Sequence, residues 1–472
     1  MHGAETNVDA ASSDLPRVGP ESLGSVWTSG WLVFVGWALL TAAALWHVAH
    51  YALPMPFADQ WPLVDLATGR IEPSLGWLFS LHNEHRMPVP KLAYLVVGSL
   101  TGYDYARMAL MNTAVLSAVA AVCLLTMRRL RGGSSLVDLF APAALLHFGH
   151  ETNLTWCFQI NFCLASGAAI LALLVIAMAR QPLRSSVAAG LAALLAIAAG
   201  CGTYGLLYVP PIAAWIGLCG AWQAHRRQTP PRQWLSLIFL SALLTAMFVA
   251  YVAAFPHGAH NPLSSPSLWQ TLTGAHRITV TSLGPVGRGL KPLTNWLMIA
   301  LIVGALYWLA REWRHGQASR MTLIGLACFL AAGLLLTLAI AHARAGGGWK
   351  DMYQSRFGML TAPLLIAMLL IWDRLSSSGA RRQFAVVCLV LLPALVVAND
   401  RKGLRDARRR LGLLQEVMTA AEQGMPPAEI SRRWSQPLFC EPADLERYLA
   451  DLQAQGMIPY HTASRPKSVS LR

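Results

Sequence analysis

Charged residues are scarce in this sequence. Lys, Arg, Asp and Glu together make up 13% of its 472 residues, about half of the share found in soluble globular proteins. Hydrophobic residues make up 55%, and the mean hydropathy is +0.45. This composition excludes a soluble globular enzyme, and repeated apolar runs of about 20 residues are long enough to cross a bilayer. The sequence therefore predicts a polytopic membrane protein.

Several motifs of secreted proteins and nucleotide-binding enzymes are also missing. The 8 cysteines include no CxxC pair and lie mostly in apolar runs, so they predict neither a disulfide framework nor a zinc site. Residues 1–30 carry four acids and one Arg, unlike the cationic start of a signal peptide. The glycine-rich stretch 284–289 lacks the GK[ST] ending of a P-loop, which excludes nucleotide binding there.

Eleven apolar segments predict an all-α fold, a transmembrane helix bundle of about 11 spans within residues 31–398. The segments are 31–53, 105–127, 136–149, 160–179, 187–199, 206–223, 234–254, 294–310, 321–342, 357–373 and 383–398. Helices are expected because lipid offers no hydrogen-bond partner to an open backbone. Segments 136–149 and 187–199 are short, which leaves the count open by one or two.

Positive charge is distributed unevenly among the loops between these segments. Lys and Arg occupy 14 of the 44 residues in one alternate set of loops, but nine of the 120 residues in the other set. Because cytoplasmic loops are enriched in Lys and Arg, the first set and the polar segment 1–30 are predicted to be cytoplasmic. The long loops 54–104, 255–293 and 343–356 then lie outside the cytoplasm. The net charge of +14 reflects this bias and contact with anionic lipid, not nucleic acid.

Residues 399–472 follow the last segment and predict a small helical C-terminal domain. Two helices are expected, near 404–423 and 443–455, and each ends before a glycine, Gly424 or Gly456. The odd number of spans places this domain outside the cytoplasm. Its basic beginning would favour the cytoplasm, but long tails cross the membrane largely regardless of charge.

The first outside loop contains an acidic residue at the expected depth of the membrane surface. Asp59 lies between Phe57 and Trp61, just after the first apolar segment. A carboxylate among aromatic residues at this depth is costly to desolvate unless it is paired or takes part in chemistry. Asp59 is therefore a candidate general base. The alternative is an exposed loop residue flanked by aromatic residues of the membrane interface.

Four ionisable side chains lie close together later in the same loop: His82, Glu84, His85 and Arg86. On a helix, the two histidines would share one face. The cluster could clamp a phosphate through Arg86, orient Asp59 or bind a metal, although it lacks the HExxH spacing of a zinc site. The alternative is an ion-paired turn at the surface.

Two further outside loops carry candidates for substrate contacts. In the second loop, Glu151, Asn153 and Gln159 offer hydrogen bonds to a sugar, and Trp156 offers a stacking face. In the last loop, Arg356 directly precedes an apolar run, where its guanidinium could hold a phosphate at headgroup depth. The alternative for Trp156 is an aromatic residue of the membrane interface, and the alternative for Arg356 is an anchor that extends toward the lipid headgroups.

This layout resembles the GT-C class of membrane glycosyltransferases, which includes protein O-mannosyltransferases and aminoarabinose lipid transferases. The resemblance rests on the cytoplasmic start, on Asp59 in a long first outside loop, on the pair Arg356-Phe357 opening a late helix, and on the outside tail. Stretches 57–61 and 82–86 also look like a bacterial branch of this class. In the class, the donor is a sugar linked to polyprenyl phosphate, and a first-loop acid activates the acceptor hydroxyl.

The resemblance implies a glycosyltransferase of the bacterial inner membrane that moves a sugar from a polyprenyl-phosphate donor to an acceptor outside the cytoplasm. That acceptor would be a cell-envelope glycan, a lipid or a protein. No metal site is assigned, and a divalent cation (Mg or Mn) is left open as a cofactor. The catalytic residues would be Asp59, Glu84 and His85; the phosphate and donor ligands Arg86, Lys350, Tyr353 and Arg356; and the substrate ligands Trp61, His82, Glu151, Asn153, Trp156 and Gln159.

Two other functions remain open on the sequence alone. One is a transporter or flippase of lipid-linked saccharide, in which the same polar residues line a path. That function requires ionisable residues within the spans, whereas the segment centres hold few, and Arg107 and Asp138 lie near segment ends. The other is a non-catalytic assembly protein of the cell envelope, whose active part would be the C-terminal domain.

Overall fold

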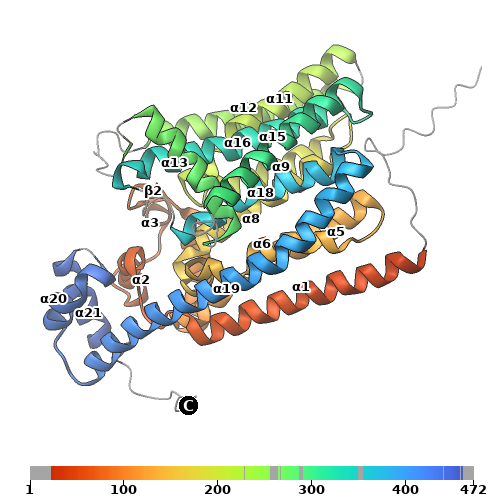
Figure 1. Cartoon of the computed structure of the whole chain (residues 1–472). Helices are drawn as coiled ribbons and strands as arrows, with labels where there is room; N and C mark the ends of the chain where they lie inside the picture. The colour runs from red at the N-terminus through yellow and green to blue at the C-terminus, as the bar shows by residue number, and fades with distance from the viewer. Residues whose placement is uncertain are drawn as a thin grey trace, which may run out of the picture.

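The computed structural model describes residues 23–227, 229–255, 264–265, 267–285, 291–348, 354–439, 441–457 and 459–460. Within these residues almost all regular structure is helical, and the single sheet is a two-stranded hairpin. Figure 1 shows the long helices side by side in a bundle, with the first loop and the C-terminal helices gathered at one end. The predicted all-α class is confirmed.

Nine helices of the described residues are long and apolar enough to cross a membrane. They are α1 (Leu23–Tyr51), α5 (Tyr105–Arg131), α8 (Ile160–Met178), α11 (Val209–Arg226), α12 (Pro231–Ala253), α15 (Lys291–His315), α16 (Arg320–Arg344), α18 (Ser355–Leu375) and α19 (Ser378–Glu422). The apolar stretches of α8 and α18 are 83% and 78% buried, against 11% and 17% in α12 and α19. Helices α8 and α18 therefore form the centre, and α12 and α19 present wide faces to lipid.

The two short apolar segments form less regular structure. Segment 187–199 forms α9 (Ser185–Ala199), which is shorter than the nine long helices. Segment 136–149 breaks into η2 (Leu136–Leu139), α6 (Phe140–Leu146) and η3 (Phe148–His150), and α7 (Glu151–Thr155) follows. The broken segment packs along α1, where the ring of Phe148 stacks 4.4 Å from that of His47. The expected 11 spans thus correspond to nine long helices and these two shorter segments.

Contacts between the elements define two ends of the bundle. At the end that we call the basic end, Gly30 lies against Ser134, and the hydroxyls of Ser185 and Ser236 are hydrogen-bonded. The opposite end, which we call the site end, is joined by backbone hydrogen bonds from Leu53 to Thr155 and from Val89 to Gly200. The two sets of loops that differ in Lys and Arg content therefore lie at opposite ends of the bundle.

The first loop folds into short elements at the site end. They are η1 (Ala58–Leu63), α2 (Val64–Ala67), α3 (Leu75–Phe79), β1 (Leu81–His82), β2 (His85–Arg86) and α4 (Pro88–Thr101). His82 and His85 do not share a helix face, because residues 82–85 close a hairpin in which the two histidines are cross-strand partners. Asn83 makes this turn possible, since its φ of +52° lies in the left-handed region that Asn tolerates.

Helix α4 has the form expected of a helix on the membrane surface. Leu92, Val96 and Leu100 are exposed and follow one another at intervals of four residues, so they share one face. The buried Lys91 ties the start of α4 to α3 by donating to the carbonyl oxygens of Trp77 (2.8 Å) and Ser80 (2.9 Å). Burial lowers the pKa of Lys91 to about 8.

Five shorter elements complete the loops around the bundle: η4 (Cys157–Gln159), α10 (Thr203–Leu206), α13 (Leu268–Val280), η5 (Thr281–Leu283) and η6 (Ala345–Gly347). Helix α13 packs on α16 at the site end, where Ala275 and Ile278 form a small apolar cluster with Ala341. The site end is therefore covered by elements from several loops.

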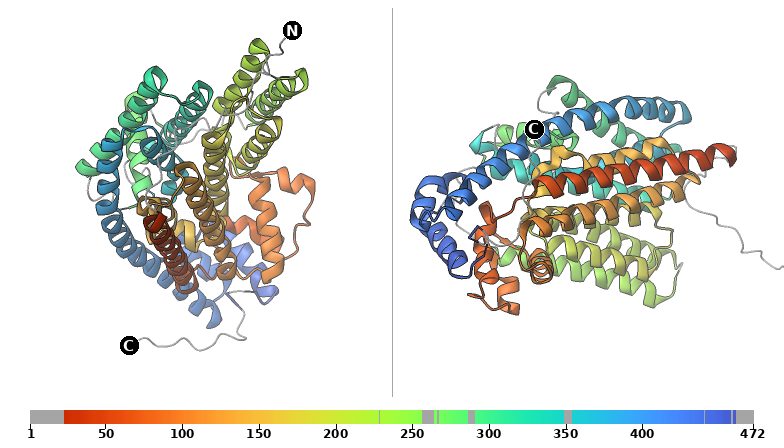
Figure 2. Two further views of the ribbon diagram at one scale, coloured as in Figure 1. Left: turned by 90° about the vertical axis from the view of Figure 1, so that its right-hand side faces the viewer. Right: turned by 90° about the horizontal axis from the view of Figure 1, so that it is seen from below.

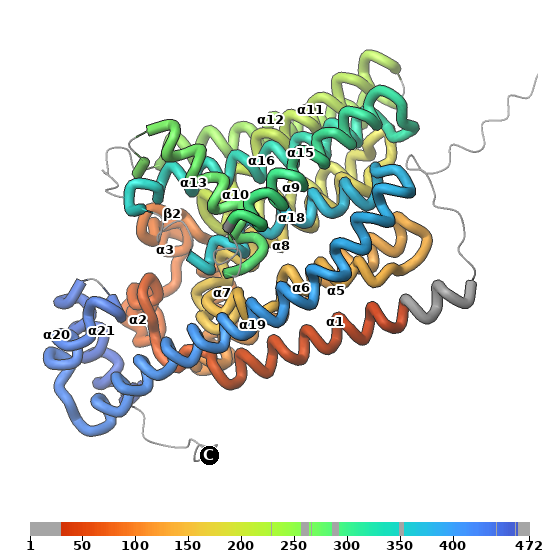
Figure 3. The backbone as a smooth tube through the Cα atoms, viewed as in Figure 1, coloured from red at the N-terminus to blue at the C-terminus, as the bar shows by residue number. Residues whose placement is uncertain are grey.

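The C-terminal region is built on a continuous extension of the last long helix. Helix α19 runs 45 residues without a break, so the expected separate helix at 404–423 is the outer half of α19, and the expected domain boundary at residue 399 lies inside it. The helix near 443–455 is confirmed as α21 (Pro442–Ala454), and α20 (Pro427–Leu438) was not predicted. Figures 2 and 3 show α20 and α21 beside the first loop, beyond the end of the bundle.

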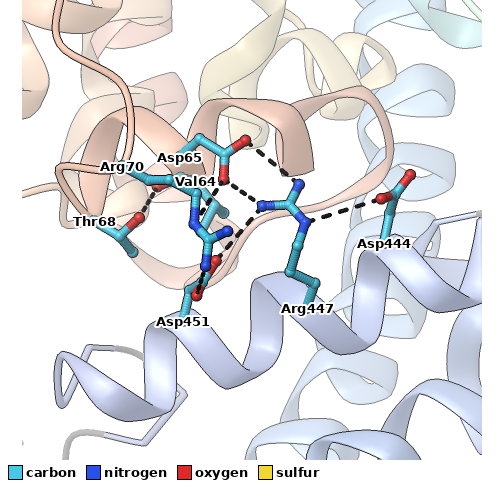
Figure 4. A network of polar contacts seen from close by, with 7 residues as sticks. All are labelled: Val64, Asp65, Thr68, Arg70, Asp444, Arg447 and Asp451. Atoms are coloured by element: carbon cyan, nitrogen blue, oxygen red, sulfur yellow. Dashed lines mark hydrogen bonds and ion pairs between the residues drawn. The ribbon is translucent and has the colours of Figure 1, made fainter.

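An ion-pair network docks α21 on the first loop (Figure 4). Asp65 of α2 accepts a hydrogen bond of 2.7 Å from Arg447, and Arg70 donates one of 2.6 Å to Asp451. Asp444 lies 4.0 Å from Arg447 on the same helix. The first loop, which carries Asp59, is therefore fixed to the C-terminal helices by charged side chains from both sides.

Candidate functional site

Asp59 and Arg356 meet at the site end of the bundle. The Oδ2 atom of Asp59 lies 4.0 Å from Nη1 of Arg356, and the two side chains are 39% and 23% exposed. Asp59 is carried by η1 of the first loop, and Arg356 by the first turn of α18. Two segments that are distant in sequence thus form one long, partly open ion pair.

Hydrogen bonds from the hairpin hold Asp59 in place. Nε2 of His82 donates to the backbone oxygen of Asp59 at 2.7 Å, and Nδ2 of Asn83 donates to its Oδ1 at 3.1 Å. The preceding residue, Ala58, has a φ of +46°, in the left-handed region, which costs a residue with a side chain about 1–2 kcal/mol. The surrounding contacts therefore fix a backbone conformation that the sequence would not adopt alone.

Burial favours the neutral form of the two hairpin histidines. Burial is the largest effect on each, and it lowers the pKa of His82 and of His85 below the ordinary value of 6.5. Nδ1 of His85 lies 2.5 Å from the hydroxyl of Thr203 in α10. The histidines therefore position the loop through hydrogen bonds.

Glu84 lies exposed at the tip of the hairpin. Burial has the largest effect on the pKa of His85 and lowers it, and the positive charge of Arg344 lowers it further. The negative charges of Glu84 and Asp59 act in the opposite direction and raise this pKa. The charges of two of the three predicted catalytic residues, Asp59 and Glu84, therefore act on the third, His85.

Arg86 is engaged elsewhere. Its guanidinium donates to the carbonyl oxygens of Phe79 (2.9 Å) and Ala254 (3.1 Å), and its backbone N–H donates to the hydroxyl of Tyr251 (3.2 Å). These bonds join the first loop to the end of α12. This placement gives Arg86 a structural role and offers no support for the predicted role as a phosphate ligand.

Glu151 is buried in an ion pair. It is 2% exposed and accepts hydrogen bonds from Arg410 of α19 and from the hydroxyl of Thr152 (2.8 Å). The hydroxyl of Ser355 donates to Thr152 at 3.0 Å, since the Thr152 proton is already directed at Glu151. The predicted sugar ligand thus connects the C-terminal helix to the first turn of α18, which carries Arg356.

The other predicted substrate ligands of the second loop are buried as well. Asn153, Trp156 and Gln159 are 0%, 2% and 1% exposed. Trp156 donates from Nε1 to Oε1 of Gln60 at 3.0 Å, and Nδ2 of Asn153 lies 3.3 Å from the backbone oxygen of Arg356. These three residues and Glu151 form what we call the floor of the site. Trp156 contacts the Asp59 segment through Gln60, and Asn153 contacts the Arg356 segment through its backbone.

Trp61 contacts the C-terminal helices. It is 0% exposed, its Nε1 donates to the backbone oxygen of Leu438 at 3.2 Å, and its ring stacks on Tyr448 with 6.2 Å between centroids. In this position the ring has no face for a sugar. Because Trp61 and Asp59 share the single helical element η1, the contact also holds the candidate base.

Known proteins give no independent assignment. No family model, curated protein or solved structure matches the chain. The likeness to GT-C glycosyltransferases therefore stays a prediction from the residues, and the function has to be argued from the geometry of the site end.

Two further predicted ligands, Lys350 and Tyr353, lie outside the described residues. Among the residues that the structure does describe, no group of three or more His, Cys, Asp or Glu side chains is placed to hold a metal ion. The site is therefore defined by Asp59, Arg356 and the groups that surround them.

The site gains three residues that the sequence interpretation did not single out. Asn83 is the direct partner of the Asp59 carboxylate, and Gln60 joins η1 to the floor. Arg410 pairs with Glu151, and its guanidinium carbon lies 5.7 Å from the ring centre of Phe57. The basic run around Arg410 was a visible signal, but it was used only to judge orientation. Asn83 and Gln60 belong to no sequence motif that would have indicated their roles.

The arrangement combines a partly exposed carboxylate with a guanidinium beside an aromatic ring. The Arg356 guanidinium carbon lies 5.5 Å from the ring centre of Phe357. Aromatic neighbours favour a cation and limit the water around it, which strengthens its attraction for an anion. Asp59 can accept a proton, and Arg356 can hold a phosphate or another oxyanion.

Proposed function

We propose that the protein is a membrane glycosyltransferase that uses a sugar linked to polyprenyl phosphate. The observation that carries the proposal is the meeting of Asp59 and Arg356 at 4.0 Å in a partly exposed position. One group suits the acceptor and the other suits the donor phosphate. The proposal places the site end outside the cytoplasm of a bacterial inner membrane, in agreement with the Lys and Arg bias of the opposite loops.

Asp59 would act on the acceptor. Its carboxylate removes the proton from the acceptor hydroxyl as the oxygen forms a bond with the anomeric carbon of the sugar. Asn83 keeps one carboxylate oxygen in position, which leaves Oδ2 for the incoming hydroxyl. Asp59 then releases the proton to water, and the enzyme is ready for another cycle.

Arg356 would act on the donor. The bond between the anomeric carbon and the phosphate oxygen breaks, and the electron pair leaves with the polyprenyl phosphate. The guanidinium of Arg356, at the first turn of α18, is placed to stabilise this negative charge together with the positive end of the helix dipole. No nucleotide is needed, because the phosphate itself is the leaving group.

A transporter or flippase is less well supported by the interior of the bundle. Two small cavities between the described membrane helices, of about 20 and 30 Å³, have room for one or two water molecules and mostly apolar linings, so neither of them offers a path for a saccharide. A path for a saccharide would need far more room. An interfacial site fits the position of Asp59 better than a transmembrane path does.

The test is turnover by the Asp59→Asn variant in proteoliposomes supplied with a panel of polyprenyl-phosphate-linked hexoses and pentoses, together with cell-envelope glycan, lipid and protein fractions as acceptors. Release of polyprenyl phosphate should fall about 10²- to 10⁴-fold, the usual contribution of a general base. Glu72→Gln is the matched control, since Glu72 is an exposed acid of the same loop with no recorded partner among the described residues. Wild-type turnover by Asp59→Asn would discard the mechanism, and saccharide flipping that survives in the variant would favour the transporter.

A further inference from the structure

The lipid-facing side of α19 changes abruptly from apolar to basic. On its apolar half the exposed side chains include Val386, Val390 and Val397, at 56%, 66% and 51% exposure. The next exposed positions on this side are Arg401, Arg405 and Arg408, with Arg409 adjacent. Intervals of three, four and seven residues keep side chains on one face of a helix, so the arginines continue the line of valines. We call these four residues the arginine stripe.

The change occurs level with the end of the apolar helix α1. Nε of Arg408 donates to the hydroxyl of Tyr51, the last residue of α1, at 3.2 Å. One turn earlier, Gly403 packs so closely on the backbone of Phe148 that a Cβ atom would lie 1.8 Å from its carbonyl oxygen. Both contacts place the stripe level with the site end of the bundle, where the apolar stretch of α1 ends.

The stripe has little compensating charge within the described residues. Asp406 pairs with Lys402, and Asp400 accepts a hydrogen bond from the backbone of Phe148, so both acids of this stretch are directed elsewhere. No ion pair is recorded for the four arginines within the part of the chain that the structure describes. A concentration of exposed cations beside a hydrocarbon-facing surface favours binding to anionic headgroups.

We propose that the arginine stripe binds the phosphate groups of anionic phospholipids in the surrounding bilayer. The occupant is bulk lipid and not the donor, because the stripe continues the lipid-facing valines, whereas Arg410, on the opposite side of α19, reaches the floor of the site through Glu151. Arginine suits this role, since its planar guanidinium can donate two hydrogen bonds to one phosphate. The proposal is independent of the catalytic role of Asp59.

The experiment compares lipid binding by the full-length wild type and the Arg401→Gln/Arg405→Gln variant. Purified protein in detergent is titrated with dioleoyl phosphatidylglycerol or dioleoyl phosphatidylcholine, and bound lipid is counted by native mass spectrometry. The wild type should prefer phosphatidylglycerol, and the variant, which lacks two surface cations, should lose about 30-fold in affinity for this lipid. The Arg432→Gln/Arg433→Gln variant is the matched control, because it removes two exposed arginines of α20, away from the line of valines.

Salt provides a second measurement on the unaltered protein. Binding of phosphatidylglycerol should weaken as sodium chloride is raised, since exposed charges are screened. Equal binding of the two lipids, equal losses in both double variants, or salt-independent binding would each overturn the proposal. Binding of polyprenyl phosphate but not phosphatidylglycerol at the stripe would also overturn it, because the stripe would then belong to the donor.

Discussion

Two carboxylate–arginine pairs lie at the same end of the bundle and differ in almost every physical respect. Glu151 and Arg410 form a tight contact, with the carboxylate side chain 3% exposed. Asp59 and Arg356 are 4.0 Å apart, with the carboxylate 39% exposed. A buried pair of this kind is costly to break, whereas an open, long pair contributes little to stability and can exchange partners. The comparison separates a structural acid from a candidate catalytic one.

The largest effect on stability is expected from Glu151→Gln. This variant leaves the charge of Arg410 without its carboxylate in a mostly buried position, and should destabilise the fold by about 3 kcal/mol. Asp59→Asn, made in the open pair, should change stability by less than about 0.5 kcal/mol. Thermal unfolding followed by tryptophan fluorescence compares the two. Equal losses of Tm would remove the distinction between the pairs.

The second prediction concerns donor affinity and separates the roles of Arg356 and Asp59. Arg356→Gln should weaken binding of a polyprenyl-phosphate sugar about tenfold, because one charged hydrogen bond to phosphate is lost. Asp59→Asn should leave this affinity nearly unchanged while turnover falls. Donor binding is measured by titration in detergent micelles, with Glu72→Gln as the unaffected control. A donor affinity that depends on Asp59 and not on Arg356 would reverse the assigned roles.

A smaller effect tests how the C-terminal helices hold the catalytic loop. Trp61→Phe removes the donor to Leu438 and should cost about 1 kcal/mol, with faster proteolysis of α20 and α21. Trp296→Phe is a suitable control, because Trp296 is 70% exposed on the surface of α15. Deleting residues 404–472 is less informative, since it also removes Arg410. Unchanged proteolysis in Trp61→Phe would show that the docking does not depend on this contact.

The smallest effect concerns pH. Burial lowers the pKa of His82 and of His85 below 6.5. As the pH falls below about 6.5, these histidines bind protons in the unfolded chain more readily than in the folded protein. The free energy of unfolding therefore decreases, by less than about 1 kcal/mol per histidine at pH 6. The fall of Tm between pH 8 and 6 should be shallower in His82→Asn and unchanged in His225→Asn. Identical pH profiles in all three proteins would contradict this.

The sequence predicts the membrane helices well and the site only in part. Apolar runs identify the helices because lipid permits few alternatives. The hairpin at 82–85 was missed because its two-residue turn depends on the left-handed backbone conformation of Asn83. The ionisable residues around Asn83, which alone were considered in this stretch, do not indicate a turn. The continuity of α19 was missed because a change from apolar to basic residues looks like a boundary, although helix propensity is maintained across it.

Residue types alone did not predict which side chains of the site would be buried. Trp61, Trp156 and Glu151 are suited to sugar binding by their chemistry, yet each is used for packing or pairing. Such assignments depend on long-range contacts, such as that of Arg410 with Glu151, which have no local pattern. The approach of Asp59 to Arg356 is the part of the candidate site that the sequence anticipated.

The most direct test of the central claim is a structure of Asp59→Asn with a polyprenyl-phosphate sugar bound. The account predicts the donor phosphate within hydrogen-bond distance of the Arg356 guanidinium, about 3 Å, and the anomeric carbon on the side facing residue 59. A donor bound at the basic end of the bundle, or at the site end without contact to Arg356, would contradict it.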